Sequence, residues 1–171
     1  TVSKAGAFMQ TIYGGGFSDG FILRFNSSDQ IDWGTYYGGS ATDYANSAFV
    51  DANGNLYIWG WTQSNDFSTL DYGGGAYYQS SINGSYDCFI IRFNSSGIRE
   101  WATYIGGTML DRTGETDGMV VNSDGIFCTG TTLSSDFPTQ TFGTSFFQGA
   151  NGGSADAFVM HFDNNLNLAW S

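Results

Sequence analysis

Charged residues, proline and histidine are scarce in this chain of 171 residues. Charged residues make up 12% of the sequence, and there is one proline and one histidine. The 16 Asp and Glu residues outnumber the 5 Lys and Arg residues, which gives a formal net charge of −11. A surface of that sign repels phosphate groups and anionic lipids, so we expect no nucleic acid and no membrane surface among the partners.

Long hydrophobic runs and cysteines are also rare. No apolar run approaches the roughly 20 residues that cross a bilayer, so we expect no membrane insertion. No signal peptide precedes Thr1, which indicates a processed product or a piece of a longer protein. Cys88 and Cys128 lie in different predicted strands. We favour two small buried side chains over a disulfide, which stays open as the alternative.

Glycine and aromatic residues are abundant instead. The chain has 25 glycines, and Phe, Trp and Tyr make up 18% of it. Disordered chains are poor in aromatic residues, so this composition indicates a folded protein. Glycine combined with aromatic and small polar residues is typical of many short strands joined by tight turns.

The sequence repeats itself with a period of 68 or 69 residues. Segments of the type Asp-x-Phe-(Ile/Val)-x-(Arg/His)-Phe begin at Asp19, Asp87 and Asp156, and a tryptophan follows 14 residues after each aspartate. A fixed period predicts a stacked or radial array, in which each unit buries its apolar faces against its neighbours. This pattern favours a scaffold over an enzyme with a single site.

Each full repeat predicts four strands. The expected strands are 43–50 and 113–121 at the first position, 56–62 and 126–132 at the second, the Asp-x-Phe segments at the third, and 33–37 and 101–105 at the fourth. Asn-Gly at Asn53 and Asp-Gly at Asp124 predict hairpin turns between the first two strands, because these residues tolerate positive φ angles.

The predicted strands are apolar without interruption, for example at 56–59, 89–91 and 158–160. A strand with one wet face alternates apolar and polar residues, whereas a strand covered on both faces need not. A two-sheet sandwich would leave polar outer faces. We therefore expect an all-β fold of β-propeller-like blades, each with four antiparallel strands, as a partial propeller of about two and a half repeats.

The order of the motifs resembles a known family. Asp-x-Phe-Ile-x-Arg-Phe-Asn, Trp-x-Thr-Tyr-x-Gly-Gly and Ser-x-Asp-Phe follow one another within residues 7–171. This order resembles the SBBP β-propeller repeat of large secreted and cell-surface proteins, especially of Bacteroidetes-like bacteria. The second unit departs from the pattern, with Arg112 in place of Tyr and three residues inserted before Val121. The resemblance implies a propeller fold and a surface setting, and it supplies no catalytic residues.

The repeat boundaries divide the chain into four expected parts. These are 1–18 as the end of a preceding repeat's connection, 19–42 as the last two strands of a first blade, 43–110 as a second blade and 111–171 as a third. Connections at 63–86 and 133–155 separate the second strand from the third. Inserts of that length are uncommon without a function or a fixed structure of their own.

No residue is assigned to catalysis, a cofactor or a metal. His161 stands where the other repeats have Arg24 and Arg92, so we interpret all three as polar side chains that pair with a neighbour or with backbone carbonyls. An enzyme would require an acidic pair across blades, such as Asp43 with Asp111. Their shared position in the repeat explains both aspartates without catalysis.

Two ligand classes stay open. Asp51-x-Asn53-x-Asn55 superficially resembles half a calcium loop, but calcium takes six to eight oxygen ligands and no acidic residue closes the loop. We favour a hairpin turn for 51–55. The aromatic pairs Tyr77-Tyr78 and Phe146-Phe147 in the connections offer stacking surfaces for sugars. A lectin-like, carbohydrate-binding propeller is therefore the alternative function.

We expect a non-enzymatic structural or interaction module of a large extracellular or cell-surface protein, of the adhesin or fibre type. A propeller has roughly four to eight blades, so two and a half units cannot close a ring. Terminal blades then present bare faces and unpaired edges, which favour association into oligomers or filaments. The expected partners are further blades of the same protein or other copies of the chain, besides surface glycans.

Overall fold

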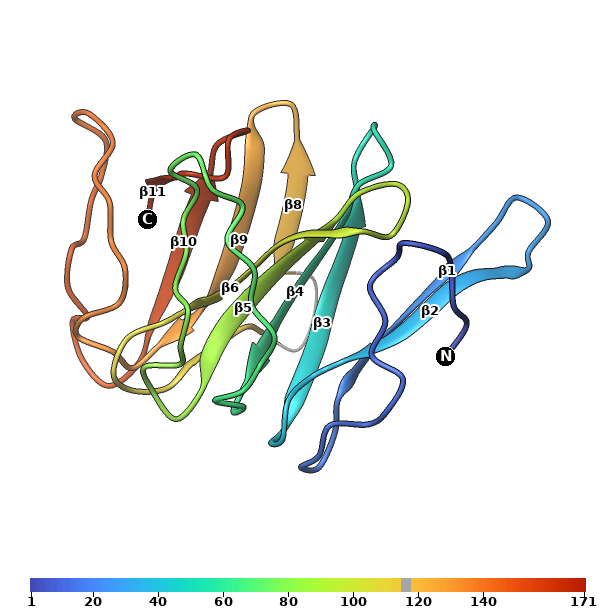
Figure 1. Cartoon of the computed structure of the whole chain (residues 1–171). Helices are drawn as coiled ribbons and strands as arrows, with labels where there is room; N and C mark the ends of the chain where they lie inside the picture. Colours follow the sequence, from blue (N-terminus) through green and yellow to red (C-terminus); the bar gives the residue numbers. More distant parts are fainter. Residues whose placement is uncertain (115–117) are drawn as a thin grey trace.

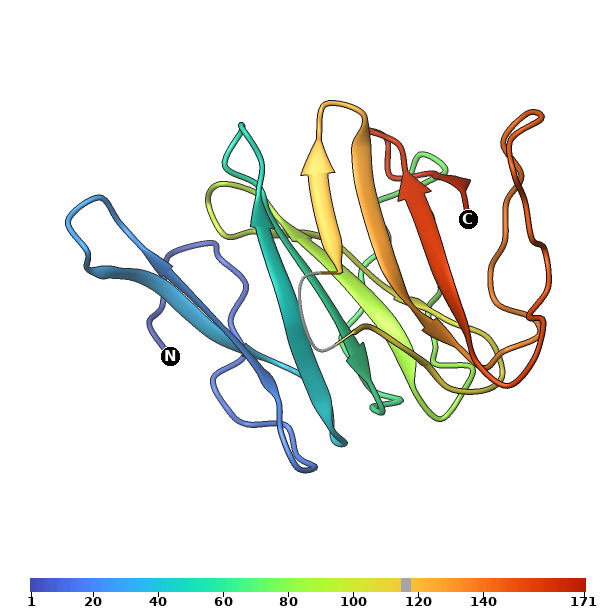
Figure 2. The same ribbon diagram turned by 180° about the vertical axis from the view of Figure 1, so that it is seen from behind.

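The structure is a computed structural model that describes residues 1–114 and 118–171. In these residues it contains eleven strands and no helix. The strands form three antiparallel sheets that follow one another along the chain and lie face to face (Figures 1 and 2). The prediction of an all-β protein is confirmed.

The middle sheet is the most regular of the three. Its strand order is β3 (Asp43–Val50), β4 (Leu56–Thr62), β5 (Asp87–Phe93) and β6 (Arg99–Ile105). The first sheet pairs β1 (Gly20–Phe25) with β2 (Ile31–Tyr37). The third sheet consists of β11 (Leu168–Trp170), β10 (Asp156–Phe162) and β9 (Gly125–Thr132), with β7 (Asp111–Arg112) and β8 (Met119–Asn122) both paired to β9. The four predicted strands of the middle sheet agree with the structure to within two residues.

The predicted strand 113–121 is wrong in part. Strand β7 ends opposite Thr131 and β8 begins opposite Cys128, so the two strands are separated by six residues in the sequence while their partners on β9 are separated by only two. In the middle sheet only three residues, 45–47, occupy the corresponding gap in β3. The three additional residues divide the strand into two short pieces. Residues 115–117 of the prediction lie outside the described part of the chain.

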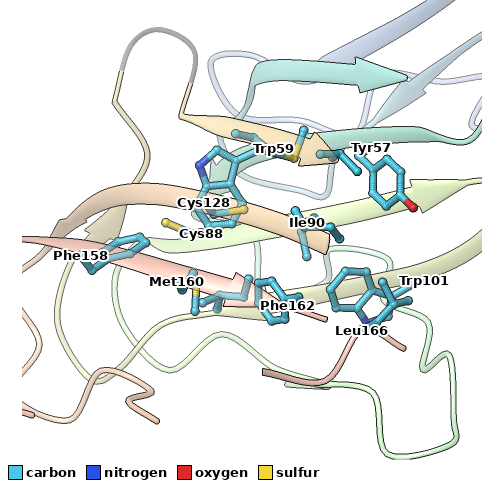
Figure 3. Close-up of a cluster of buried hydrophobic side chains, with 14 of the residues drawn as sticks. Tyr57, Trp59, Cys88, Ile90, Trp101, Cys128, Phe158, Met160, Phe162 and Leu166 are labelled. Atoms are coloured by element: carbon cyan, nitrogen blue, oxygen red, sulfur yellow. The ribbon is translucent and has the colours of Figure 1, made fainter. Parts of the chain in front are cut away.

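Two apolar cores separate the three sheets. The first core lies between the first and middle sheets and contains Ile22, Trp33, Tyr37, Ile58, Phe67, Phe89, Ile91, Phe93, Ala102 and Tyr104. The second core lies between the middle and third sheets and includes Tyr57, Trp59, Cys88, Ile90, Trp101, Cys128, Phe158, Met160, Phe162 and Leu166 (Figure 3). Strand β5 contributes alternate residues to both cores, because successive side chains of a strand point to opposite faces. Its uninterrupted apolar sequence is explained by this double burial.

Both cysteines lie in the second core as free, fully buried thiols. The prediction of two buried side chains in place of a disulfide is confirmed. Burial raises the pKa of Cys88 and of Cys128 well above that of an exposed thiol, so both are neutral and unreactive in the folded chain.

The long connection 63–86 lies beside β6 at the edge of the middle sheet. The indole Nε1 of Trp101 donates a hydrogen bond to the carbonyl oxygen of Tyr77 at 2.9 Å. The N-terminal segment makes the same contact beside β2, where Trp33 Nε1 donates to the carbonyl oxygen of Phe8 at 2.9 Å. Each segment is thereby fixed against its sheet by the same hydrogen bond from one tryptophan.

Candidate interaction surfaces

The first sheet exposes an apolar strip on the face that points away from the middle sheet. This first outer face consists of Phe21, Leu23 and Phe25 on β1, and Phe21 is 67% exposed. The side chain between the first two, Ile22, points the other way into the first core. The strip is therefore the second face of a strand whose opposite face is already packed.

The third sheet exposes a comparable strip on its far side. This third outer face consists of Val120 on β8, Phe127 on β9, and Val159 and His161 on β10, and Val159 is 49% exposed. The β10 residues of this strip alternate with Phe158, Met160 and Phe162, which fill the second core. The two outer faces thus bound the stack of three sheets at its opposite ends.

In the middle sheet, the residues that correspond to those of the two outer faces are buried. Phe89 follows Asp87 as Phe21 follows Asp19, and it is 1% exposed because it packs in the first core. Ile90 corresponds in the same way to Val159 and is 0% exposed in the second core. The first outer face thus corresponds to the face of the middle sheet that packs on the first sheet, and the third outer face corresponds to the face that packs on the third sheet.

The repeat-position cations pair with their neighbours. Arg24 contacts the carboxylate of Asp32, Nε to Oδ2 at 3.5 Å, and donates to the carbonyl oxygen of Ser95. Arg92 forms an ion pair with Glu100, Nη1 to Oε2 at 2.9 Å.

His161, at the same position of β10, stacks on Phe127 with ring centroids 4.3 Å apart. Its Nε2 lies 2.9 Å from the carbonyl oxygen of Asp124. The histidine therefore covers part of the third outer face and has a backbone oxygen as its polar partner.

Buried carboxylates fix the loops between the sheets. Asp43 Oδ2 accepts hydrogen bonds from the Gly39 amide at 2.7 Å and from Ser64 Oγ at 2.8 Å. Asp111 Oδ2 accepts the corresponding bonds at 2.7 Å from the Gly107 amide and from Ser134 Oγ. These aspartates stabilise loop backbone that would otherwise be buried without partners.

The acidic pair suggested by the sequence, Asp43 with Asp111, is divided between these two separate networks. The carboxylates that lie close together are instead Asp19 with Asp43 and Asp87 with Asp111. Burial, assisted by the neighbouring Asp19, raises the pKa of Asp43. Burial and Asp111 raise the pKa of Asp87 to about 6, although hydrogen bonds from Asn83, Gly84 and Gln79 oppose the shift.

These two pairs were not predicted from the sequence, although both have the same spacing between their partners. The partners are 24 residues apart in each case, so the spacing recurs from one unit to the next. Each pair joins the third strand of one sheet to the first strand of the next. The pairs are held by loop amides and hydroxyls, which is the chemistry of a structural junction.

The segment 51–55 forms a turn. The carboxylate of Asp51 accepts hydrogen bonds from the amides of Asn53 at 2.8 Å and Asn55 at 2.9 Å, and from Asn55 Nδ2 at 2.8 Å. Burial raises the pKa of Asp51, but these bonds outweigh it and lower the pKa overall. Within residues 1–114 and 118–171, no three or more His, Cys, Asp and Glu side chains are grouped to hold a metal ion.

The aromatic pairs of the two connections have different surroundings. Tyr77 packs against the second core, 5.8 Å from Phe162 between ring centroids, and Tyr78 shares a hydrogen bond with Thr69. Phe146 is 94% exposed, because the part 141–150 of the connection 133–155 stands away from the sheets (Figures 1 and 2). The Tyr77 ring is therefore not free to stack on a sugar.

A cavity of about 500 Å³ separates the connection 133–155 from the third sheet. Its apolar lining comes mainly from Phe137, Phe142, Phe146, Phe147, Phe158, Val159 and Trp170. Its polar lining includes Ser134, Gln148 and Asp156. The volume falls within the range of cavities that bind small ligands or peptide side chains.

No protein-family model and no curated protein matches this chain. In the described part of the chain, no helix has the length and hydropathy needed to cross a membrane.

Proposed function

We propose that the chain is a non-enzymatic structural module whose three sheets are propeller-like blades, and that it assembles through blade-to-blade packing with further blades of the same protein or with other copies of the chain. The third outer face of one copy packs on the first outer face of the next. The module belongs to an extracellular or cell-surface protein of the adhesin or fibre type, in keeping with the resemblance to SBBP repeats.

One observation carries this proposal. The positions of Phe21 and Val159 are exposed at the ends of the stack, while their counterparts Phe89 and Ile90 are fully buried in the middle sheet. Covering a large apolar side chain contributes roughly 1.5–3 kcal/mol. A strip of several such side chains on each end supports association, because soluble monomers rarely expose contiguous apolar patches.

The geometry of the existing cores specifies how copies join. The two sides of the middle sheet differ, since one face packs on the first sheet and the other on the third. Association between unlike faces is head-to-tail, and it generates rings if the rotation closes and filaments if it does not. A propeller ring and a fibre are the two outcomes of the same interface.

Single charged substitutions on each face test the proposal by sedimentation velocity. Phe21→Asp places a charge in the first outer face, and Val159→Asp places a charge in the third. Each variant alone is expected to stay monomeric at concentrations where the wild type associates. Ile12→Asp, at an exposed apolar residue of the N-terminal segment, is the matched control and is expected to associate like the wild type.

A mixture of the two variants separates head-to-tail packing from other modes. Each variant retains the face that the other has lost, so an equimolar mixture is expected to form dimers and nothing larger. If Phe21→Asp or Val159→Asp alone still dimerises, like faces are pairing and the head-to-tail interface is wrong. A wild-type chain that remains monomeric at high concentration contradicts packing between copies.

The alternative, a carbohydrate-binding propeller, has less support. It depends on aromatic rings in the connections, and Tyr77 is engaged in the second core. A glycan array distinguishes the two functions: binding that is lost in Phe147→Ala and retained in Phe21→Asp favours the lectin.

A further inference from the structure

A second cavity lies between the middle and third sheets, at the end of the stack where three hairpin turns meet. These are the β3–β4 turn 51–55, the β8–β9 turn 122–125 and the β10–β11 turn 163–167, which all lie at the upper end of the stack in Figure 1. The cavity has a volume of about 490 Å³, which is within the range of sites for small ligands and side chains. We name this cavity the turn cleft.

The floor of the turn cleft is apolar and belongs to the second core. It consists of Tyr57, Val121, Ile126 and Leu166, which are at most 8% exposed, and of Phe49, which packs against this core from β3. The packing of the two sheets holds these side chains in place. The floor is therefore formed before a ligand binds, which lowers the entropic cost of binding.

The rim of the turn cleft is polar and acidic. It includes the carboxylates of Asp51 from the middle sheet and of Asp163 from the third sheet, together with Asn53, Asn122 and Asn164. Among the described residues that line the cleft there is neither a lysine nor an arginine.

Hydrogen bonds keep both carboxylates ionised. Burial raises the pKa of Asp163, but bonds from Asn167 Nδ2 and from the amides of Asn167 and Asn165 outweigh it and lower the pKa overall. The pKa of Asp51 is lowered in the same way. Because an anionic group faces the cleft from each of the two sheets, the cleft attracts cations and repels anions.

Asp163 can accept a further hydrogen bond. Its Oδ2 accepts from Asn167 Nδ2 at 2.9 Å, and each oxygen of a carboxylate has two lone pairs. The adjacent Asn164 is fixed, because its Nδ2 donates to the carbonyl oxygen of Ser123 at 2.9 Å and so joins two turns of the third sheet. The acceptor therefore lies on a wall of the cleft whose turns are already held together.

The chain itself supplies a cation to the corresponding turn at the other junction. Between the first and middle sheets, Arg24 of β1 donates to the carbonyl oxygen of Ser95 in the β5–β6 turn. Arg92 and Asn164 hold the same repeat positions at the junction of the middle and third sheets. An equivalent contact there would place a cation beside the turn cleft.

Arg92 contacts its own sheet instead. Its Nη1 lies 2.9 Å from Glu100 Oε2, and its Nε donates to the Tyr57 hydroxyl at 3.1 Å. That hydroxyl lies 3.3 Å from Asp51 Oδ2, so Arg92 offsets part of the charge of Asp51. The lowered pKa of Asp163 depends more on its hydrogen bonds from the turn than on the charge of His161. Asp163 is therefore the carboxylate that is left for an added cation.

We propose that the turn cleft binds an alkylammonium group, which is the chemistry of a free primary amine and of a lysine side chain on a partner polypeptide. The ammonium contacts the Asp163 carboxylate at the rim, and the attached methylene groups lie on the apolar floor. Charge-assisted hydrogen bonds orient the ammonium, and burial of the methylene groups contributes to affinity. The site goes beyond the proposed function, because its lining residues lie outside both outer faces.

Two amines and a neutral analogue test the cleft by titration followed through the NMR chemical shifts of backbone amides. n-Butylammonium chloride and the blocked lysine N-acetyl-lysine N-methylamide are expected to bind saturably at one site per chain, with the largest shifts at 51–55, 122–125 and 163–167. n-Butanol has the same chain length without the charge and is expected to bind at least about tenfold more weakly. The amine that binds more tightly identifies the source as a free amine or a lysine side chain.

Asp163→Asn removes the charge and keeps the turn, since an Asn side chain also accepts hydrogen bonds from backbone amides. It is expected to weaken binding of n-butylammonium about tenfold. Asp71→Asn is the matched control, because it changes the net charge equally at an exposed turn of the connection 63–86, where Asp71 Oδ1 accepts from the Gly73 amide at 2.8 Å. This control should bind like the wild type.

Absence of saturation, equal binding of n-butanol, or largest shifts outside the three turns overturns the inference, and these readouts use the wild-type chain alone. Equal effects of Asp163→Asn and Asp71→Asn also overturn it, because the amine is then attracted only by the net charge. The Phe21→Asp variant should bind n-butylammonium like the wild type, so failure of packing between outer faces and failure of the turn cleft are separable.

Discussion

Phe21 and Phe89 occupy the same position of successive sheets, yet Phe21 is 67% exposed and Phe89 is 1% exposed. The difference is not in the strand, since both follow an aspartate by two residues in the same sequence pattern. It comes from the neighbour: a sheet covers Phe89 and none covers Phe21. The burial of this position therefore depends on whether a neighbouring sheet covers it.

Trp59 is the clearest test of the second core. Its side chain is fully buried, packs edge-on against Phe158, and donates from Nε1 to the carbonyl oxygen of Thr129 at 3.1 Å. Trp59→Ala is expected to lower the free energy of unfolding by about 3–5 kcal/mol, as large-to-small core substitutions do. Urea unfolding followed by circular dichroism measures the loss.

The neighbouring Trp61 is the control, because it lies nearer the end of β4, outside the second core, and is only half-buried, stacked on Tyr44. Trp61→Ala is expected to cost on the order of 1 kcal/mol. Equal losses for the two substitutions would mean that the second core contributes no more than a surface contact.

Most of the strands could be predicted from the sequence, because turn residues and apolar runs are local signals. Strands 43–50 and 56–62 have the predicted bounds. The break between β7 and β8 could not be foreseen, since it depends on how the chain pairs with β9 on either side of the insertion. Local propensity contains no information about that register.

Gly106→Ala tests the close approach of the backbone to Asp87. The new Cβ would lie 2.5 Å from the carboxyl carbon, so the loop or the aspartate must move. The expected cost in the free energy of unfolding is about 2–3 kcal/mol, as for overpacked sites. Chemical denaturation measures it.

Gly153→Ala is the matched control, because a Cβ at Gly153 meets no atom within 4 Å. Its effect should stay within about 0.5 kcal/mol. If Gly106→Ala is equally tolerated, the approach to Asp87 is not tight in solution.

The interaction surfaces could be predicted only in part from the sequence. Continuous apolar strands predicted coverage on both faces, and this holds for β5 but not for β1. A continuous apolar sequence shows that both faces of a strand can be buried. Whether Phe21 is exposed depends on which sheets lie beside β1.

The two thiols provide a probe of global unfolding. Cys88 and Cys128 are fully buried and neutral in the folded chain. A thiol reagent such as Ellman's reagent is expected to titrate no thiol in native buffer and two in denaturant. Fast modification of either cysteine in native buffer would contradict a closed second core, since access requires separation of the middle and third sheets.

The raised pKa of Asp87 predicts a specific dependence of stability on pH. Its pKa is about 6 in the folded chain against 3.8 for an ordinary aspartate, so the folded state binds this proton more tightly than the unfolded state. The resulting stabilisation is fully present below about pH 4 and is lost as the pH rises through 6. A shift of about two units corresponds to about 3 kcal/mol.

Other carboxylates also titrate, so the contribution of Asp87 is measured as a difference between wild type and Asp87→Asn. Relative to the wild type, the variant is expected to gain about 3 kcal/mol in free energy of unfolding between pH 4 and pH 7, because it lacks the carboxylate that ionises in a buried site. Asp51→Asn is the opposed control: the pKa of Asp51 is lowered, so its stabilisation is lost as the pH falls. A difference for Asp87→Asn that is constant with pH would show that hydrogen bonds from Gln79, Asn83 and Gly84 fully offset the burial of this carboxylate.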